Sequence, residues 1–156
     1  MHKRALTLIV FGVAVGVGCR TIEQPRRHYD TYASAVAAGE SSRGWLPAWV
    51  PPTATDLFFQ NNIDTNELWL RFRLDKTAAD SIQQFLRTVP ADEVTISSPA
   101  RASDWWFEGL IEQEPANDAA LYAYVFRGTG NPVPQSTVIA FDKASPLVYV
   151  WTSQLK

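Results

Sequence analysis

The chain has 156 residues, of which 14 are Lys or Arg, 16 are Asp or Glu, and one is Cys. This length suits a single domain that buries its own core without disulfides or metal ions. The formal net charge of −2 argues against a nucleic acid partner, because binding to phosphates needs a basic face.

Residues 1–18 have the layout of an export signal. His2, Lys3 and Arg4 give a positive start, and residues 5–17 carry no charge. A permanent membrane span needs about 20 apolar residues, and this run is shorter and contains glycines. We therefore expect residues 1–18 to be a cleaved signal peptide.

The signal ends in Val15-Gly16-Val17-Gly18-Cys19, which resembles the lipobox of bacterial lipoproteins. The resemblance implies cleavage before Cys19 and diacylglycerol on its thiol. Family members usually carry Leu, Val or Ile where Gly16 stands, whereas the small Gly18 fits the pattern. Two or three acyl chains would hold the protein on a membrane almost permanently.

An ordinary secreted protein is the alternative, but it would carry Cys19 as an unpaired thiol in an oxidising compartment. Cys19 is followed by Arg20 rather than Asp. In Gram-negative lipoproteins this implies sorting to the outer membrane, facing the periplasm. We therefore expect lipid-anchored attachment to the cell envelope through Cys19.

A short spacer is predicted to follow the lipidated cysteine over residues 19–28, since the stretch has no apolar periodicity and contains Pro25. Residues 29–156 are predicted to form a single α+β domain. Cleavage would remove Lys3 and Arg4, which takes the basic count from 14 to 12 against 16 acids.

A helix is predicted over residues 29–38, with Asp30 as a possible N-cap and Gly39 as its stop signal. Residues 44–52 contain three prolines. Proline excludes regular helix and keeps its neighbours extended. We expect this segment to wrap around the domain.

Two strands are predicted over residues 56–63 and 67–74, with residues 64–66 as the connecting turn. The second strand alternates apolar and polar residues, which is typical of a half-buried antiparallel strand. Its polar face includes Trp69, which we expect to lie over arginine side chains next to water.

Apolar residues at helical spacing predict a helix over residues 76–89, capped by Asp75 or Thr77 and ended by Pro90. A short strand is predicted over residues 93–96. Beyond it we expect a loop over residues 99–104, and then a short helix that opens with the cluster Trp105-Trp106-Phe107 and runs to Ile111.

Three strands are predicted in the C-terminal third, over residues 120–127, 136–142 and 147–152. Their short connections favour an antiparallel meander. The predicted fold is therefore α+β, a mainly antiparallel sheet with the helix of residues 76–89 packed on one face.

Residues 44–47, 52–57 and 62–66 read GWLP, PTATDL and NIDTN, and Trp69 follows them. This pattern resembles one found in short uncharacterised bacterial lipoproteins. The resemblance implies the same class of protein and no particular activity.

Six tryptophans and eight phenylalanines make the chain rich in aromatic residues. Trp45, Trp49, Trp105 and Trp106 are candidates for a binding face. The alternative is that these rings fill the core of a small domain.

A catalytic set is hard to find. His2 would be cleaved away, and His28 falls in the predicted spacer, so neither is expected in a formed site. Asp104 and Glu108 would share one helix face beside tryptophans, as in a glycan-processing site. The same spacing also fits an ordinary helix start, because acids favour the first turn.

Oxygen-bearing side chains recur over residues 56–66, but their spacing does not match an EF-hand, and turn chemistry explains them. We expect no metal and no cofactor. The leading hypothesis is a non-catalytic module that binds another envelope protein or component. The alternatives are an envelope glycan enzyme using Asp104 and Glu108, and an immunity or inhibitor lipoprotein.

Overall fold

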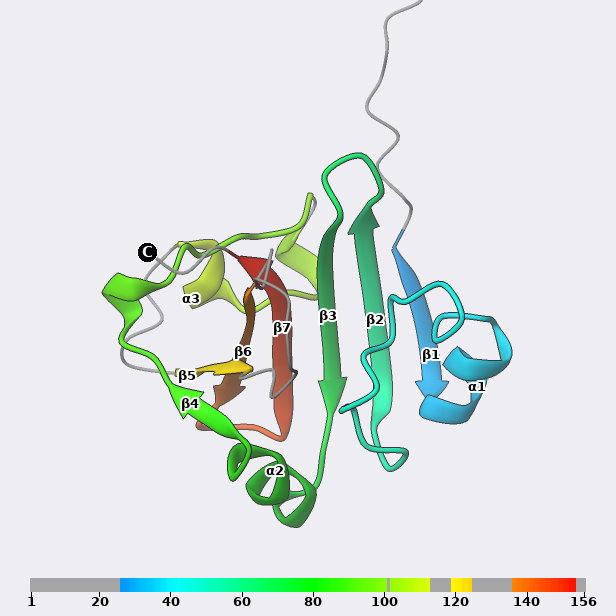
Figure 1. The fold of residues 1–156 in the computed structure, drawn as a ribbon, viewed down its shortest axis with the longest axis horizontal. Helices are drawn as coiled ribbons and strands as arrows, with labels where there is room; N and C mark the ends of the chain where they lie inside the picture. The colour runs from blue at the N-terminus through cyan, green and yellow to red at the C-terminus, as the bar shows by residue number, and fades with distance from the viewer. Residues whose placement is uncertain (1–25, 101, 113–118, 125–135, 154–156) are drawn as a thin grey trace, which may run out of the picture.

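The protein is a single antiparallel sheet with a few short helices (Figure 1). The computed structural model describes residues 26–100, 102–112, 119–124 and 136–153. Seven strands follow one another across the sheet in the order β1-β2-β3-β7-β6-β5-β4, and each neighbouring pair is antiparallel. The strands are β1 (Arg27–Thr31), β2 (Thr55–Asn62), β3 (Glu67–Arg73), β4 (Leu86–Thr88), β5 (Ala119–Tyr124), β6 (Ser136–Asp142) and β7 (Leu147–Ser153).

The helices are short and lie between the strands in sequence. They are α1 (Tyr32–Ala37), α2 (Lys76–Gln83), α3 (Glu108–Ile111) and two 3-10 turns, η1 (Ala91–Glu93) and η2 (Ala102–Asp104). The predicted α+β fold is confirmed, with α2 packed on one face of the sheet. No helix in the described ranges is long and apolar enough to cross a membrane.

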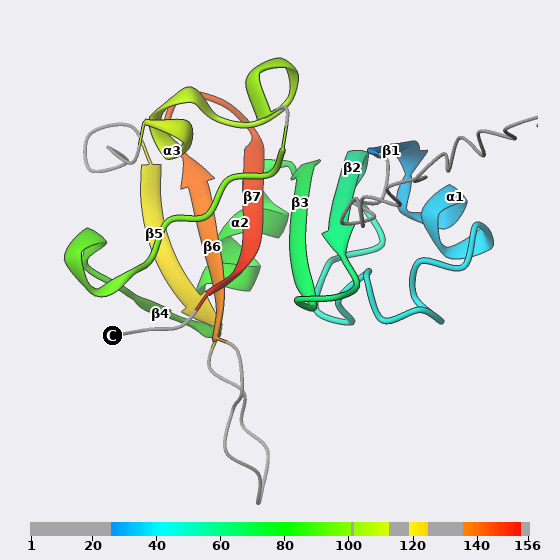
Figure 2. The same cartoon turned by 90° about the horizontal axis from the view of Figure 1, so that it is seen from above.

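Each face of the sheet carries a buried apolar cluster. The face covered by α1, α2 and the segment between α1 and β2, here named the helix face, presents Leu57, Phe59 and Phe72. The opposite face is covered by residues 89–112 and is named here the tryptophan face. Seen from above, α2 lies behind β6 and β7, whereas α3 lies near the ends of β5 and β6 (Figure 2). The tryptophan face includes Trp69, Trp105, Trp106, Tyr149 and Trp151.

The second predicted strand is confirmed as β3, but the expectation for Trp69 is wrong. Trp69 is only 7% exposed and belongs to the core of the tryptophan face. The reason is that β3 lies inside the sheet, between β2 and β7. Residues 89–112 then cover the side that the alternation alone would leave to water.

The sheet begins with a strand, β1, that was not predicted. Arg27 and His28, assigned to the spacer, and Tyr29, assigned to a helix, lie in β1 because they pair with β2. Helix α1 starts only at Tyr32, and Thr31 rather than Asp30 is its N-cap, bonded to the Ser34 amide. The predicted stop is confirmed, since Gly39 follows the helix with φ +86°, a backbone conformation that glycine adopts at little cost.

The helix predicted over residues 76–89 ends at Gln83. Asp75 caps it by accepting from the Ala78 amide at 2.9 Å. Leu86–Thr88 forms β4 instead, because pairing with β5 supplies hydrogen bonds that the end of a helix would leave unmade. Phe85, expected on the apolar stripe, is consequently 74% exposed.

The strand predicted over residues 93–96 is wrong, since η1 occupies residues 91–93 and only Val94 forms a bridge. The wrapping segment of residues 44–52 is irregular as predicted, and Trp45 and Trp49 pack against the helix face. The C-terminal meander is confirmed as β5-β6-β7. Residues 125–127 of its predicted first strand lie outside the described residues.

A buried carboxylate ties the start of the chain to the rest of the domain. Glu40 is fully buried, and it accepts from Arg27 Nε at 2.7 Å and from the Tyr29 hydroxyl at 2.7 Å. Arg43 Nη2 lies 3.0 Å away. Arg27 also donates to Asn61 Oδ1 of β2 at 2.7 Å. The Glu40 network therefore joins β1, β2 and the segment after α1.

Burial by itself would raise the pKa of Glu40, but hydrogen bonds from Arg27, Tyr29 and Arg43 lower that pKa below its ordinary value. A carboxyl whose pKa is lower in the folded state stabilises the fold fully above its unfolded pKa. That contribution is lost as the pH falls through the folded value.

We predict that Glu40→Gln lowers the free energy of unfolding by about 3 kcal/mol near pH 7, because it leaves the Arg27 charge without its buried partner. The wild type should lose stability as the pH falls through the lowered folded-state pKa of Glu40, and this loss should shrink in the variant. Urea unfolding at several pH values measures both effects. Glu93→Gln, in the exposed pair with Arg87, is the control and should cost under about 1 kcal/mol. Equal costs for the two variants would contradict this account.

Candidate functional site

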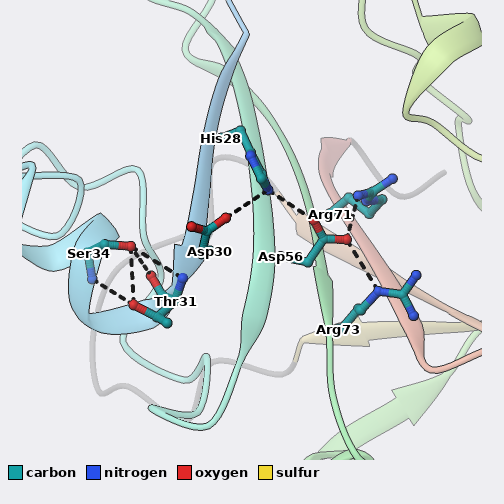
Figure 3. A network of polar contacts seen from close by, with 7 residues as sticks. All are labelled: His28, Asp30, Thr31, Ser34, Asp56, Arg71 and Arg73. Carbon is teal, nitrogen blue, oxygen red and sulfur yellow. Dashed lines mark hydrogen bonds and ion pairs between the residues drawn. The ribbon is translucent and has the colours of Figure 1, made fainter.

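A partly exposed cluster of charged side chains lies on β1, β2 and β3, where residues 89–112 cover the tryptophan face only in part. His28 Nε2 lies 2.9 Å from Asp56 Oδ1. Arg71 Nη2 and Arg73 Nε donate to Asp56 Oδ2 at 2.8 and 3.3 Å (Figure 3). We name these four residues the Asp56 cluster.

The backbone of β2 is distorted where Asp56 lies. Asp56 has φ +51°, and the pairing register of β2 against β3 shifts between Thr55 and Phe58. Asp and Asn tolerate the left-handed region better than other non-glycine residues. A bulge re-aims the side chains of its strand, and here the Asp56 carboxylate reaches both neighbouring strands. Backbone strain of this kind is typical of functional positions.

One aromatic ring holds the cluster in place. The His28 ring stacks on Phe58, with 4.2 Å between ring centroids. The Arg71 guanidinium lies 4.1 Å from the centre of the same ring, and Trp105 stacks against it with centroids 6.0 Å apart. Arg71 also donates to the Trp105 carbonyl at 3.2 Å. Phe58 therefore fixes the directions of His28 and Arg71.

The parts of the cluster that reach water are His28 and Arg73, whose side chains are 42% and 49% exposed. Arg71 is only 14% exposed. Asp30, which is 93% exposed, lies 4.0 Å from His28 Nε2. A partner approaching this surface would therefore meet groups of both charges.

The chemistry available to the cluster is recognition by charge. Both oxygens of Asp56 are already bonded to cationic or polar nitrogens, and the contacts found for the cluster within the described ranges include no Ser, Thr or Cys side chain. In the same ranges, no three side chains of His, Cys, Asp or Glu are grouped to hold a metal ion. Nucleophilic catalysis needs a poised hydroxyl or thiol beside a base.

This site is not predicted from the sequence, because His28 falls in the predicted spacer. The alternation of Phe58 with its neighbours on β2 was the available signal, since it places Asp56 and Phe58 on one face. The alternation does not predict strand β1, which brings His28 beside these two residues.

The candidate catalytic pair is not assembled as predicted. Asp104 ends η2, whereas Glu108 opens α3, so the two carboxylates do not lie on one helix. Asp104 instead forms an ion pair with Arg26.

The four candidate tryptophans do not form one exposed face. Trp105 and Trp106 are 3% and 5% exposed in the core of the tryptophan face. Trp45 and Trp49 pack, partly buried, against the opposite face. The core interpretation therefore describes this set better. Cys19 lies outside the described residues.

An apolar groove of about 340 Å³ runs beside α2 on the helix face, lined by Trp49, Pro51, Ala78, Ser81, Ile82 and Phe85. A second hollow, of about 390 Å³, lies between α2 and the turn that joins β6 to β7. Neither hollow contains residues of the Asp56 cluster.

Residues 23–73 match the family model of the YbbD head domain, which indicates a bacterial family. The match covers about a third of the chain and includes β1, α1, β2 and β3, hence the whole Asp56 cluster and the Glu40 network. No curated protein and no solved structure matches the chain.

We predict that Asp56→Asn and Asp56→Val differ in stability by about 1–2 kcal/mol, with Val the less stable, because only the β-branched residue adds strain at φ +51°. Both variants remove the charge, but Asn keeps an oxygen that can accept from Arg71 and Arg73, so the measured difference is an upper limit on the backbone strain. Urea denaturation of the two proteins at the same pH measures it. Equal stabilities would show that position 56 stores no strain.

Proposed function

We propose that the protein is a bacterial lipoprotein whose sheet domain binds another protein of the cell envelope. In this proposal residues 1–18 are removed, lipid is attached to Cys19, and the domain faces the periplasm from the outer membrane. The signal of residues 1–18 and the lipobox-like residues before Cys19 support the anchor. The match to the YbbD head domain supports a bacterial origin.

The position of the first strand supports a domain held close to the membrane. Only eight residue steps separate Cys19 from Arg27, where β1 begins. A fully extended chain covers 3.3–3.6 Å per residue, so this distance is about 28 Å at most. The domain therefore works within the envelope, near the bilayer that holds its lipid.

The contacts of the Asp56 carboxylate favour a binding function over a catalytic one. His28, Arg71 and Arg73 all contact its carboxylate, so Asp56 is not left as a free base or nucleophile. The cluster instead offers a fixed pattern of charges on a rigid sheet, which favours recognition of a complementary protein surface. The alternative of a glycan enzyme assumed that Asp104 and Glu108 share one helix, and they belong to different helices.

A photo-crosslinking amino acid at position 30, beside the Asp56 cluster, tests the proposal in intact bacteria. We expect one discrete crosslinked envelope protein, which should disappear when Arg73→Glu reverses an exposed charge of the cluster. The same crosslinker at position 76, where Lys76 on α2 is 87% exposed, is the control and should not give that product.

The binding proposal fails if position 30 gives no discrete product, or if positions 30 and 76 give the same one. It also fails if Arg73→Glu leaves the product unchanged while the variant accumulates normally. Thermal unfolding of the purified variant shows that the substitution has not disrupted the fold.

A further inference from the structure

The tip of the β2–β3 hairpin carries an apolar side chain that the fold does not bury. Ile63 is 55% exposed, whereas its neighbours in the turn are polar. The Asp64 amide donates to Asn62 Oδ1 at 3.0 Å, and Asn66 has φ +56°. These are the local bonds and backbone angles of a defined turn. Ile63 is therefore held outward on a defined turn.

This hairpin tip lies at the end of the sheet where the chain enters β1 (Figure 1). Arg27, the first residue of β1, pairs with Phe59, whereas β2 continues to Asn62 before it turns. Three further residues at about 3.3 Å each carry the tip about 10 Å beyond the start of β1. The hairpin therefore projects in the direction from which the chain arrives.

The chain between Cys19 and Arg27 is short enough to bring the tip to a bilayer. Its extended limit is about 28 Å, but a relaxed coil of eight steps spans about 16 Å. With lipid on Cys19, a chain of that span would hold the start of β1 within about 16 Å of the membrane surface, and the projecting tip covers about 10 Å of that distance.

We propose that the β2–β3 hairpin is the membrane-facing end of the domain, with Ile63 resting among the lipid headgroups. The inference rests on the proposed lipid anchor at Cys19. In this orientation the Asp56 cluster lies further from the bilayer, because Asp56 is six residues, or about 20 Å, down β2 from Asn62. The face proposed to bind a partner thus remains accessible.

Phe85 provides the contrast that tests the role of the tether. It is larger than Ile63 and 74% exposed, but it follows α2, which lies at the other end of the sheet (Figure 1). If apolar exposure alone decided the orientation, Phe85 would meet the bilayer. If the short chain between Cys19 and Arg27 determines the orientation, Ile63 contacts the bilayer instead.

The experiment uses the mature chain, residues 19–156, which keeps every described element. Its Cys19 thiol is coupled to maleimide lipids in nanodiscs of phosphatidylethanolamine and phosphatidylglycerol. Nitroxide-headgroup lipids then broaden the NMR signals of amides near the surface. Outside residues 19–26, which adjoin the lipid, we expect residues 62–66 to be broadened most, and Ile63→Ser to weaken this broadening about fivefold. Phe85→Ser should change nothing there.

Strongest broadening at Phe85 and α2, or no preference of residues 62–66 over those of the Asp56 cluster, would overturn the proposal. An unchanged pattern in Ile63→Ser would also overturn it, because Ile63 would then contribute nothing to the orientation. The chemical coupling replaces acylation by the cell, so this experiment can fail while the lipoprotein assignment holds. Conversely, a protein without lipid in bacteria would contradict the lipoprotein assignment, but it would not change the broadening pattern in nanodiscs.

Discussion

The rest of the structure depends on the buried contact between Arg27 and Glu40. Glu40 has no exposed surface and takes hydrogen bonds from Arg27 and Tyr29 of β1, while Arg27 also bonds to Asn61 of β2. A buried carboxylate is costly without such partners, so the network specifies how the first strand docks. That strand carries His28 into the Asp56 cluster. It is also the strand through which a lipid anchor on Cys19 would pull on the domain.

The two faces of the sheet differ in how completely they are covered. The helix face is closed by α1, α2 and the proline-containing segment between α1 and β2, and it holds one of the two apolar clusters of the core. The tryptophan face is covered mainly over its C-terminal strands, because residues 89–112 pack against Tyr149 and Trp151. Over β1, β2 and β3 it leaves His28 and Arg73 accessible to water. The stretch that matches the YbbD head domain contains this open part, and the C-terminal strands that buttress it lie outside the match.

Local patterns in the sequence predicted the elements that local physics controls. The alternation in residues 67–74 and the cap at Asp75 gave β3 and the start of α2 correctly. The predictions were wrong where contacts between residues distant in sequence determine the structure. Leu86–Thr88, predicted as the end of a helix, pairs with β5 as a strand. Arg27–Thr31 forms a strand because it pairs with β2. The site was missed for the same reason, since His28, Asp56, Arg71 and Arg73 come from three strands and form no motif in the sequence.

We propose that lipid on Cys19 holds the domain on a membrane, and the intact mass of the protein purified from bacterial membranes tests this proposal most directly. The account predicts a mass that lacks residues 1–18 and includes lipid, and it predicts that Cys19→Ser loses the lipid. An unmodified chain that is cut elsewhere and found in the soluble fraction would contradict the account.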